Sequence, residues 1–124
     1  MQKLSAAALA CSIPLVFGAL AGCKRTPTKN DAEAEAGRTF AMVCARCHGP
    51  DGGGSSLVPS LATPPRNFRD AAFQKERSDA DLARVISEGK NAMPAFANIY
   101  TPEQISGLVQ VIRGFDPARP ARPR

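Results

Sequence analysis

The 124-residue sequence contains a single histidine, His48, together with four cysteines and three methionines, and it has no tryptophan. A structural zinc site needs four ligands, which usually come as two pairs of cysteine or histidine residues. One histidine and one thiol pair outside the N-terminal segment do not complete such a set. A catalytic pair of carboxylates is not evident either. These absences argue against a zinc site and give no support for an acid–base enzyme.

Charge is not strongly biased, since 16 basic and 11 acidic residues give a formal net charge of +5 at pH 7. This mild surplus does not indicate binding to nucleic acid. Residues 116–124 are rich in proline and arginine, which predicts an extended and flexible tail. Much of the basic surplus lies at this end of the chain, at Arg113, Arg119, Arg122 and Arg124.

The first 22 residues have the pattern of a secretory signal peptide, with Lys3 ahead of a mostly apolar run. The sequence Leu-Ala-Gly before Cys23 resembles the lipobox of bacterial lipoproteins. The resemblance implies cleavage before Cys23 and a lipid on its sulfur and amine. The alternative is that residues 1–22 are retained as a transmembrane anchor, although the run is short and carries polar residues and a proline. Both interpretations place the chain at a membrane, in an oxidising compartment.

Residues 23–30 are polar and lack apolar periodicity, which predicts a tether between the lipid and a folded domain. That domain is expected over residues 31–115, a length that suits one small domain. Lys24 stands where an aspartate would favour retention in the inner membrane. By resemblance to other lipoproteins, the chain is therefore expected on the periplasmic side of the outer membrane.

The segment Cys44-Ala45-Arg46-Cys47-His48 carries the strongest chemical signal in the chain. Two thiols three residues apart, followed directly by a histidine, form the pattern of covalent c-type haem attachment. On one helical turn both sulfurs lie on the same face and reach the vinyl groups along one porphyrin edge. His48 then lies under the iron as an axial ligand. A redox-active dithiol and a structural disulfide are the weaker alternatives, because the thiols follow a helical run and the disulfide would not need the histidine.

An iron with one histidine ligand needs a sixth ligand or stays open to small molecules. Met93 lies in a loop between two predicted helices, and Pro94 restricts it to an extended backbone. His/Met ligation raises the reduction potential of the iron. Met42 lies two residues before Cys44 and is expected to point away from the haem. The alternative for Met93 is packing in the core beside Phe96.

Two further residues are candidates for contacts around the haem. A metal-bound histidine usually donates its other ring proton to a carbonyl or carboxylate. The carbonyl of Pro59 is our candidate for that acceptor. Arg66, with Asn67, is a candidate for hydrogen bonding to a haem propionate, and a solvated arginine is the alternative.

Three helices are predicted, over residues 31–45, 78–88 and 101–113. Capping boxes begin the second and third, at Ser78 with Asp81 and at Thr101 with Gln104. Gly37 inside the first helix suggests close approach by another element. Residues 49–77 are expected to form an irregular loop around a haem edge, with four apolar side chains turned inward: Leu57, Leu61, Phe68 and Phe73.

With these residues placed, the chain resembles class I monohaem cytochrome c, and in particular small domains similar to the haem subunit III of cbb3-type oxidases. The resemblance covers residues 31–115 and rests on Gly37, Phe40, Cys44, Cys47, His48, Gly49, residues 65–68, residues 89–94 and the Leu-Val-x-x-Ile-Arg run at 108–113. It implies an all-α fold of three main helices in which the N- and C-terminal helices cross. It also implies one covalent haem c, with thioethers at Cys44 and Cys47 and axial ligands His48 and Met93.

One position departs from that family, which usually has an aromatic residue in the C-terminal helix where this chain has Val111. The helix crossing is then expected to rely on Phe40 and Phe115.

The function expected from these observations is electron transfer rather than catalysis, because both axial positions of the iron are filled. The partners are then redox proteins and a membrane reached through the lipid, with no nucleic acid and no small-molecule substrate. Two alternatives remain: a haem subunit fixed in a larger oxidoreductase, and a gas sensor or peroxidase-like site with a labile Met93. The lack of a second histidine argues against peroxidase chemistry.

Overall fold

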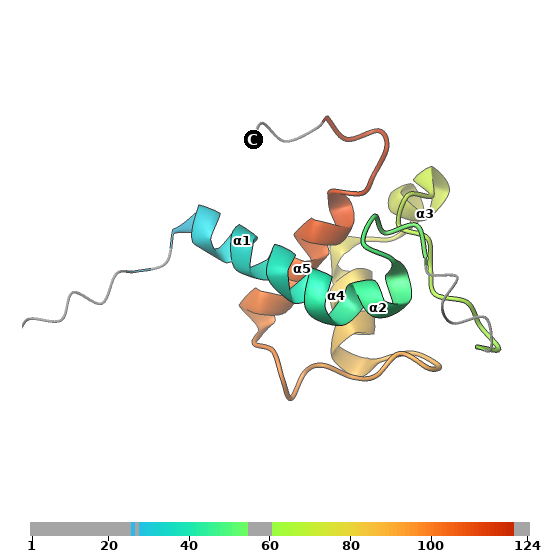
Figure 1. The fold of residues 1–124 in the computed structure, drawn as a ribbon, viewed down its shortest axis with the longest axis horizontal. Helices are drawn as coiled ribbons and strands as arrows, with labels where there is room; N and C mark the ends of the chain where they lie inside the picture. Colours follow the sequence, from blue (N-terminus) through green and yellow to red (C-terminus); the bar gives the residue numbers. More distant parts are fainter. Residues whose placement is uncertain (1–25, 27, 55–60, 121–124) are drawn as a thin grey trace, which may run out of the picture.

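The computed structural model describes residue 26, residues 28–54 and residues 61–120. Its elements are α1 (Lys29–Thr39), the π-helix η1 (Phe40–Cys44), α2 (Ala45–His48), α3 (Ala71–Glu76), α4 (Asp79–Glu88) and α5 (Pro102–Arg113) (Figure 1). The predictions for residues 1–22, Cys23, Leu57 and Pro59 concern positions outside the described residues. Within the part of the chain that is described, none of the helices combines the length and the apolar character needed to cross a membrane.

The N-terminal helix is longer than the sequence pattern predicted. It begins at Lys29, because Thr28 accepts a hydrogen bond from the Asp31 backbone and Asp31 accepts one from Thr28. The segments α1, η1 and α2 then follow one another without a break to His48. Gly49 ends the helix with φ +76°, a value that suits glycine. One continuous helix therefore carries Phe40, both thiols and the histidine.

Helices α1 and α5 cross, as predicted, and Figure 1 shows α5 passing across the long N-terminal helix. Ala36 and Gly107 meet at the crossing, where a Cβ added to Gly107 would lie 3.1 Å from the Ala36 Cβ. The prediction that Gly37 marks this contact was wrong, because a Cβ at Gly37 would meet nothing within 4 Å. The small residue that allows the close approach lies in α5.

Apolar side chains from η1, α4 and α5, with Phe68 from the loop before α3, form one core beside this crossing. Its buried members are Phe40, Phe68, Leu82, Ile86, Ile105, Leu108, Val109 and Ile112. Burying a side chain of this size stabilises the fold by about 1.5–3 kcal/mol. The Phe40 and Phe115 rings lie 5.1 Å apart, while Val111 is only half-buried. This contact agrees with the expected reliance on Phe40 and Phe115.

The two later helices begin where their capping boxes predicted. Ser78 caps α4 and pairs with Asp81, while Thr101 caps α5 and pairs with Gln104. Each N-cap side chain accepts a hydrogen bond from a backbone amide in the first turn, which satisfies a donor that the helix itself leaves free.

Two stretches differ from the expectation of irregular or extended chain. Residues 71–76 form the short helix α3, whose first amides are bonded by the side chain of Asp70. Residues 116–119 form a turn, in which the Arg119 amide donates to the Asp116 carbonyl at 3.1 Å. Arg113 is not part of a solvated tail, because it ends α5 and its side chain is only 14% exposed.

Gly107→Val is expected to lower the free energy of unfolding by about 1–3 kcal/mol, because the added methyl groups would force α1 and α5 apart. Ser106→Val is the control, since Ser106 is the exposed neighbour on the same helix and receives the same β-branched side chain. Valine is about as good a helix former as serine and a better one than glycine, so helix propensity predicts little loss in either variant. Denaturant unfolding measures both variants. A Gly107→Val protein that loses no more stability than Ser106→Val would show that the contact between α1 and α5 does not set the cost.

Candidate functional site

The two thiols lie on successive parts of the N-terminal helix, at the end of η1 and within α2. Cys44 is half-buried and Cys47 is exposed, and both are free thiols. Burial, with a smaller effect from the Cys47 thiol, raises the pKa of Cys44 to about 11. A redox-active dithiol needs a lowered pKa, because the thiolate is the reactive form. This environment therefore does not suit the dithiol alternative.

His48 ends α2 and is held by a carbonyl from a distant part of the chain. Its Nδ1 lies 3.2 Å from the backbone oxygen of Arg66. A carbonyl only accepts hydrogen bonds, so Nδ1 carries the proton and Nε2 keeps its lone pair free. Burial lowers the pKa of His48, and the bond to Arg66 opposes this only in part. The imidazole is therefore neutral at pH 7, the form that binds a metal.

The ring of Phe68 covers one side of the histidine. The two rings are stacked, with centroids 4.4 Å apart and planes inclined by 17°. Phe68 is buried, and its amide donates to the Gly52 carbonyl at 2.7 Å. Gly52 has φ +71°, and a Cβ there would lie 2.7 Å from the ring of Phe115. Glycine at position 52 therefore leaves room for the Phe115 ring, while its carbonyl holds the Phe68 amide.

The acceptor for the His48 ring proton differs from the predicted one. The acceptor for the His48 ring proton is the carbonyl of Arg66, whereas Pro59, our candidate, is outside the described residues. The guanidinium of Arg66 lies over the ring of Phe73, 5.5 Å from its centroid. The stacking of Phe68 on His48 was not predicted, although Phe68 was expected to turn inward.

Met93 lies in a short turn that is fixed to the end of α4. The Lys90 and Met93 backbones exchange two hydrogen bonds, at 3.0 and 2.9 Å, with Asn91 at φ +55° between them. Gly89 has φ +77°, and a Cβ there would lie 2.6 Å from the Met93 oxygen. Met93 is half-buried beside the core, whereas Met42 is 74% exposed, as expected for a residue that points away.

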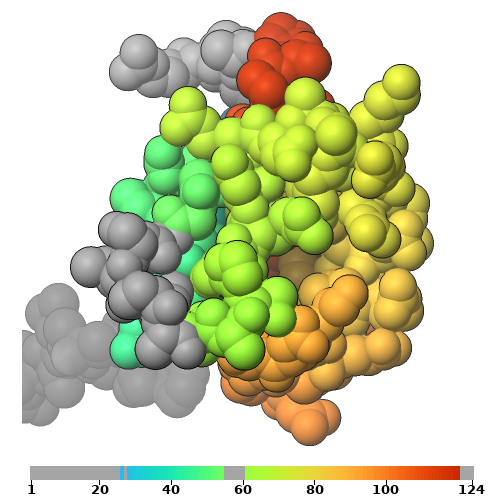
Figure 2. Space-filling view, turned by 90° about the vertical axis from the view of Figure 1, so that its right-hand side faces the viewer, coloured from blue at the N-terminus to red at the C-terminus, as the bar shows by residue number. Residues whose placement is uncertain are grey.

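The loop is also bonded to the last turn of α4 beyond the methionine. The Phe96 amide donates to the Ile86 carbonyl at 3.1 Å, and the Ala97 amide donates to the Ser87 carbonyl at 3.2 Å. Figure 2 shows a hollow on the face between residues 61–70, in yellow-green, and the loop after α4, in orange. The segments that carry Arg66 and Met93 thus border the same recess.

These residues suit a covalently attached haem better than a metal held by the protein alone. Among the described residues, no group of three or more histidine, cysteine or acidic side chains is arranged to hold a metal ion. What the helix offers is two free thiols and a neutral imidazole with one free nitrogen. That donor set fits a macrocycle bound by two thioethers and one axial nitrogen.

Comparison with known proteins gives matches to one group of haem proteins. Residues 31–112 match the family described as cytochrome c oxidase, cbb3-type, subunit III. This span contains Cys44, Cys47, His48 and Met93.

The individual relatives include an oxidase subunit and cytochromes c6. The chain is 39% identical over 80 residues to the cbb3-type cytochrome c oxidase subunit CcoP of Rubrivivax gelatinosus, covering 64% of this chain and 25% of that protein. It is 35% identical over 80 residues to cytochrome c6 of Nostoc sp. (strain PCC 7120 / SAG 25.82 / UTEX 2576), covering 62% of this chain and 65% of the relative. The chain thus spans a quarter of the first relative and just under two thirds of the second.

The solved structure of the KustC0563 c-type cytochrome is similar in fold and in sequence. It superposes with a TM-score of 0.59 at 35% identity, covering 65% of this chain and 96% of that chain.

Gly89→Ala is expected to lower the free energy of unfolding by at least about 1 kcal/mol, because a left-handed backbone disfavours a Cβ and the Met93 and Ala95 backbones occupy its place. Gly37→Ala is the matched control, since its added Cβ meets open space in a helix where alanine is preferred. Chemical denaturation of both variants tests this. A Gly89→Ala protein as stable as Gly37→Ala would show that the Met93 turn does not need glycine.

Proposed function

Because the chain belongs to the cytochrome c oxidase, cbb3-type, subunit III family, we propose that it carries single electrons with an iron held between His48 and Met93. The predicted all-α class I cytochrome c fold and the single covalent haem c are confirmed by the family match and the structural neighbour. Haem-based electron transfer follows from the family as well. The ligands, the anchor and the partners are our proposals.

Cys44 and Cys47 form the thioethers in this proposal. They stand three positions apart on one helix, with two residues between them, so their sulfurs lie on the same face. The raised pKa of Cys44 keeps that thiol protonated at pH 7, so thiolate-driven exchange is slow. Two covalent bonds from a single rigid helix would fix the orientation of the bound group.

The observation that carries the proposal is the hydrogen bond between His48 Nδ1 and the Arg66 carbonyl. It fixes the tautomer, orients the ring and leaves the lone pair of Nε2 free to bind a metal. Stacking on Phe68 restrains the ring further. An imidazole held in this way can serve as an axial ligand with little rearrangement between oxidation states.

Met93 is the proposed second axial ligand. A thioether is a soft donor, and its pairing with histidine raises the reduction potential. Support comes from the bonded turn at residues 90–93 and the attachment of residues 96 and 97 to α4, which restrict where the methionine can lie. Of the other methionines, Met42 is exposed and Met1 belongs to the proposed signal peptide.

When bound, the haem iron supplies the one-electron ferric–ferrous couple, and the chain supplies its ligands and its surroundings. With both axial positions filled by side chains, no coordination site remains for a substrate, so the proposed role is a carrier and not an enzyme. Cys47 and the neighbouring Arg46 are exposed, so the thioether edge would be open to a redox protein. Such contacts are small and short-lived.

We place the chain on the periplasmic side of a bacterial membrane, with the outer membrane favoured and a lipid on Cys23. The lipobox pattern and the polar residues 23–30 support this arrangement. A tether of this kind keeps a small carrier close to membrane-bound donors and acceptors.

A second candidate is a haem subunit fixed in a larger oxidoreductase. It is favoured by the 39% identity to an oxidase subunit, CcoP. Permanent co-purification of the chain with a membrane oxidase would favour this candidate over a diffusing carrier.

Visible spectra of the oxidised and reduced protein, with and without carbon monoxide, test the ligands. The wild type is expected to show the sulfur-to-iron charge-transfer band and to resist the gas. Met93→Ala should lose the band completely and bind the gas, because the sixth position opens. Met42→Ala is the control and should match the wild type, because its side chain is 74% exposed. A wild type that binds the gas readily would instead indicate a gas sensor.

Cys23→Ser is expected to move the protein from the membrane fraction to the soluble periplasmic fraction, because the lipid would have no attachment point. Mass spectrometry of the wild type should find the lipid on Cys23. Cys11→Ser, in the signal segment, serves as the control and should leave the protein at the membrane. A Cys23→Ser protein that resists extraction by alkaline carbonate would instead support residues 1–22 as a retained anchor.

A further inference from the structure

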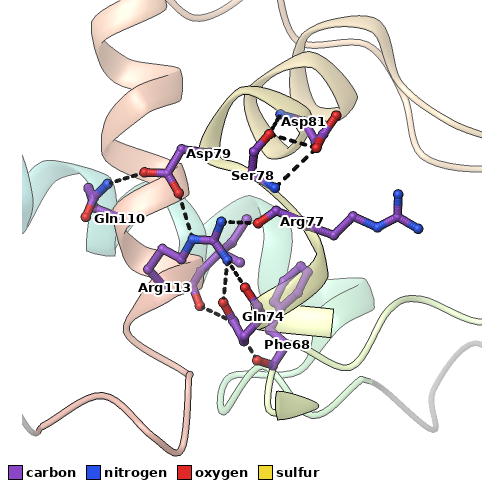
Figure 3. A network of polar contacts seen from close by, with 9 residues as sticks. Phe68, Gln74, Arg77, Ser78, Asp79, Asp81, Gln110 and Arg113 are labelled. Carbon is purple, nitrogen blue, oxygen red and sulfur yellow. Dashed lines mark hydrogen bonds and ion pairs between the residues drawn. The ribbon is translucent and has the colours of Figure 1, made fainter. Parts of the chain in front are cut away.

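Gln74 of α3 is the single buried polar side chain among the described residues, and it joins two distant parts of the chain. Its Nε2 donates to the Phe68 carbonyl at 2.7 Å and to the Ile112 carbonyl at 3.0 Å. Figure 3 shows this amide between the Phe68 backbone and the end of α5. Residues 49–77 were expected to form a loop, so no role was predicted for Gln74.

Arg113 fixes which way the amide of Gln74 points. Its Nη1 donates to both Oε1 and the backbone oxygen of Gln74 at 2.8 Å, and its Nε pairs with Asp79 at 2.7 Å. Its Nη2 donates to the Arg77 carbonyl (Figure 3). Reversal of the amide would place Oε1 against two carbonyl oxygens and NH2 against a guanidinium. The network therefore holds Nε2 toward Phe68.

The Phe68 backbone is in this way bonded on both sides. Its amide is held by Gly52 and its carbonyl by Gln74, both at 2.7 Å. The same residue stacks on His48, and two positions before it stands the carbonyl that accepts the His48 proton. A shift of Phe68 would move both contacts of the imidazole together.

We propose that Gln74 is a positioning residue for His48, acting through the Phe68 backbone to hold the Arg66 carbonyl on Nδ1. This inference rests on the proposed function, in which His48 is an axial ligand. A hydrogen bond from Nδ1 makes an imidazole a stronger electron donor. A weaker bond would favour the ferrous iron, so loss of the Gln74 donor is expected to raise the reduction potential.

Two variants remove the donor and one leaves it in place. Gln74→Leu removes the whole amide, while Gln74→Glu keeps the size and the contact with Arg113 but offers no N–H to Phe68. Gln74→Glu is the variant expected to fold, should Gln74→Leu not do so. Asp79→Asn is the matched control, because it weakens the pairing of Arg113 at the exposed rim and leaves Gln74 bonded to Phe68.

All measurements use the haem-containing protein. They are the exchange rate of the His48 Nδ1 proton by NMR, the midpoint potential of the haem and the free energy of unfolding. Both Gln74 variants are expected to exchange about tenfold faster than the wild type, the change that loss of one hydrogen bond produces. Gln74→Leu is expected to shift the potential upward, whereas in Gln74→Glu the added negative charge opposes that shift, so proton exchange is the deciding measurement for that variant. Asp79→Asn should change neither.

Unchanged exchange and potential in the Gln74 variants would overturn the inference, as would equal changes in Asp79→Asn at an equal loss of stability. A wild-type spectrum without imidazole ligation would overturn the proposed function itself. Imidazole ligation in the wild type with unaffected Gln74 variants would overturn the positioning role alone.

Discussion

The position of the His48 ring depends on a hydrogen bond between segments that are 18 residues apart in the chain. Nδ1 meets the Arg66 carbonyl, and the ring stacks on Phe68 two residues further on. Since the short segment from Arg66 to Phe68 provides both contacts, any change in its position changes the direction in which Nε2 of His48 points. The Gly52 carbonyl and the Gln74 amide hold that segment from opposite sides.

The helices supply the rigid frame for this contact. One continuous helix from Lys29 to His48 carries both thiols and the histidine, and its crossing with α5 is set by Ala36 against Gly107. Arg113, at the end of α5, then bonds to carbonyls of Gln74 and Arg77, at the end of α3. Such a frame favours electron transfer, because little reorganisation energy is needed when a ligand hardly moves as the iron changes charge.

Much of the fold could be predicted from local chemistry. Ser78 and Thr101 begin helices because their side chains bond amides three residues on, within one turn of the chain. The apolar positions of α5, Ile105, Leu108, Val109 and Ile112, all become buried. By contrast, Gly37 was the wrong choice for the helix contact, because both helices contain a glycine and the sequence does not show which one faces the other.

By itself, the sequence determined the thiol pair with its histidine and the ends of two helices, because these depend on residues within a few positions of one another. Only the tertiary structure decided that the Arg66 carbonyl meets His48, that Phe68 stacks on it, and that Arg113 and Gln74 form one partly buried network. Carbonyl groups are present at every residue, so no sequence pattern distinguishes the one that becomes the acceptor. That choice follows from how loops and helices pack over the whole domain.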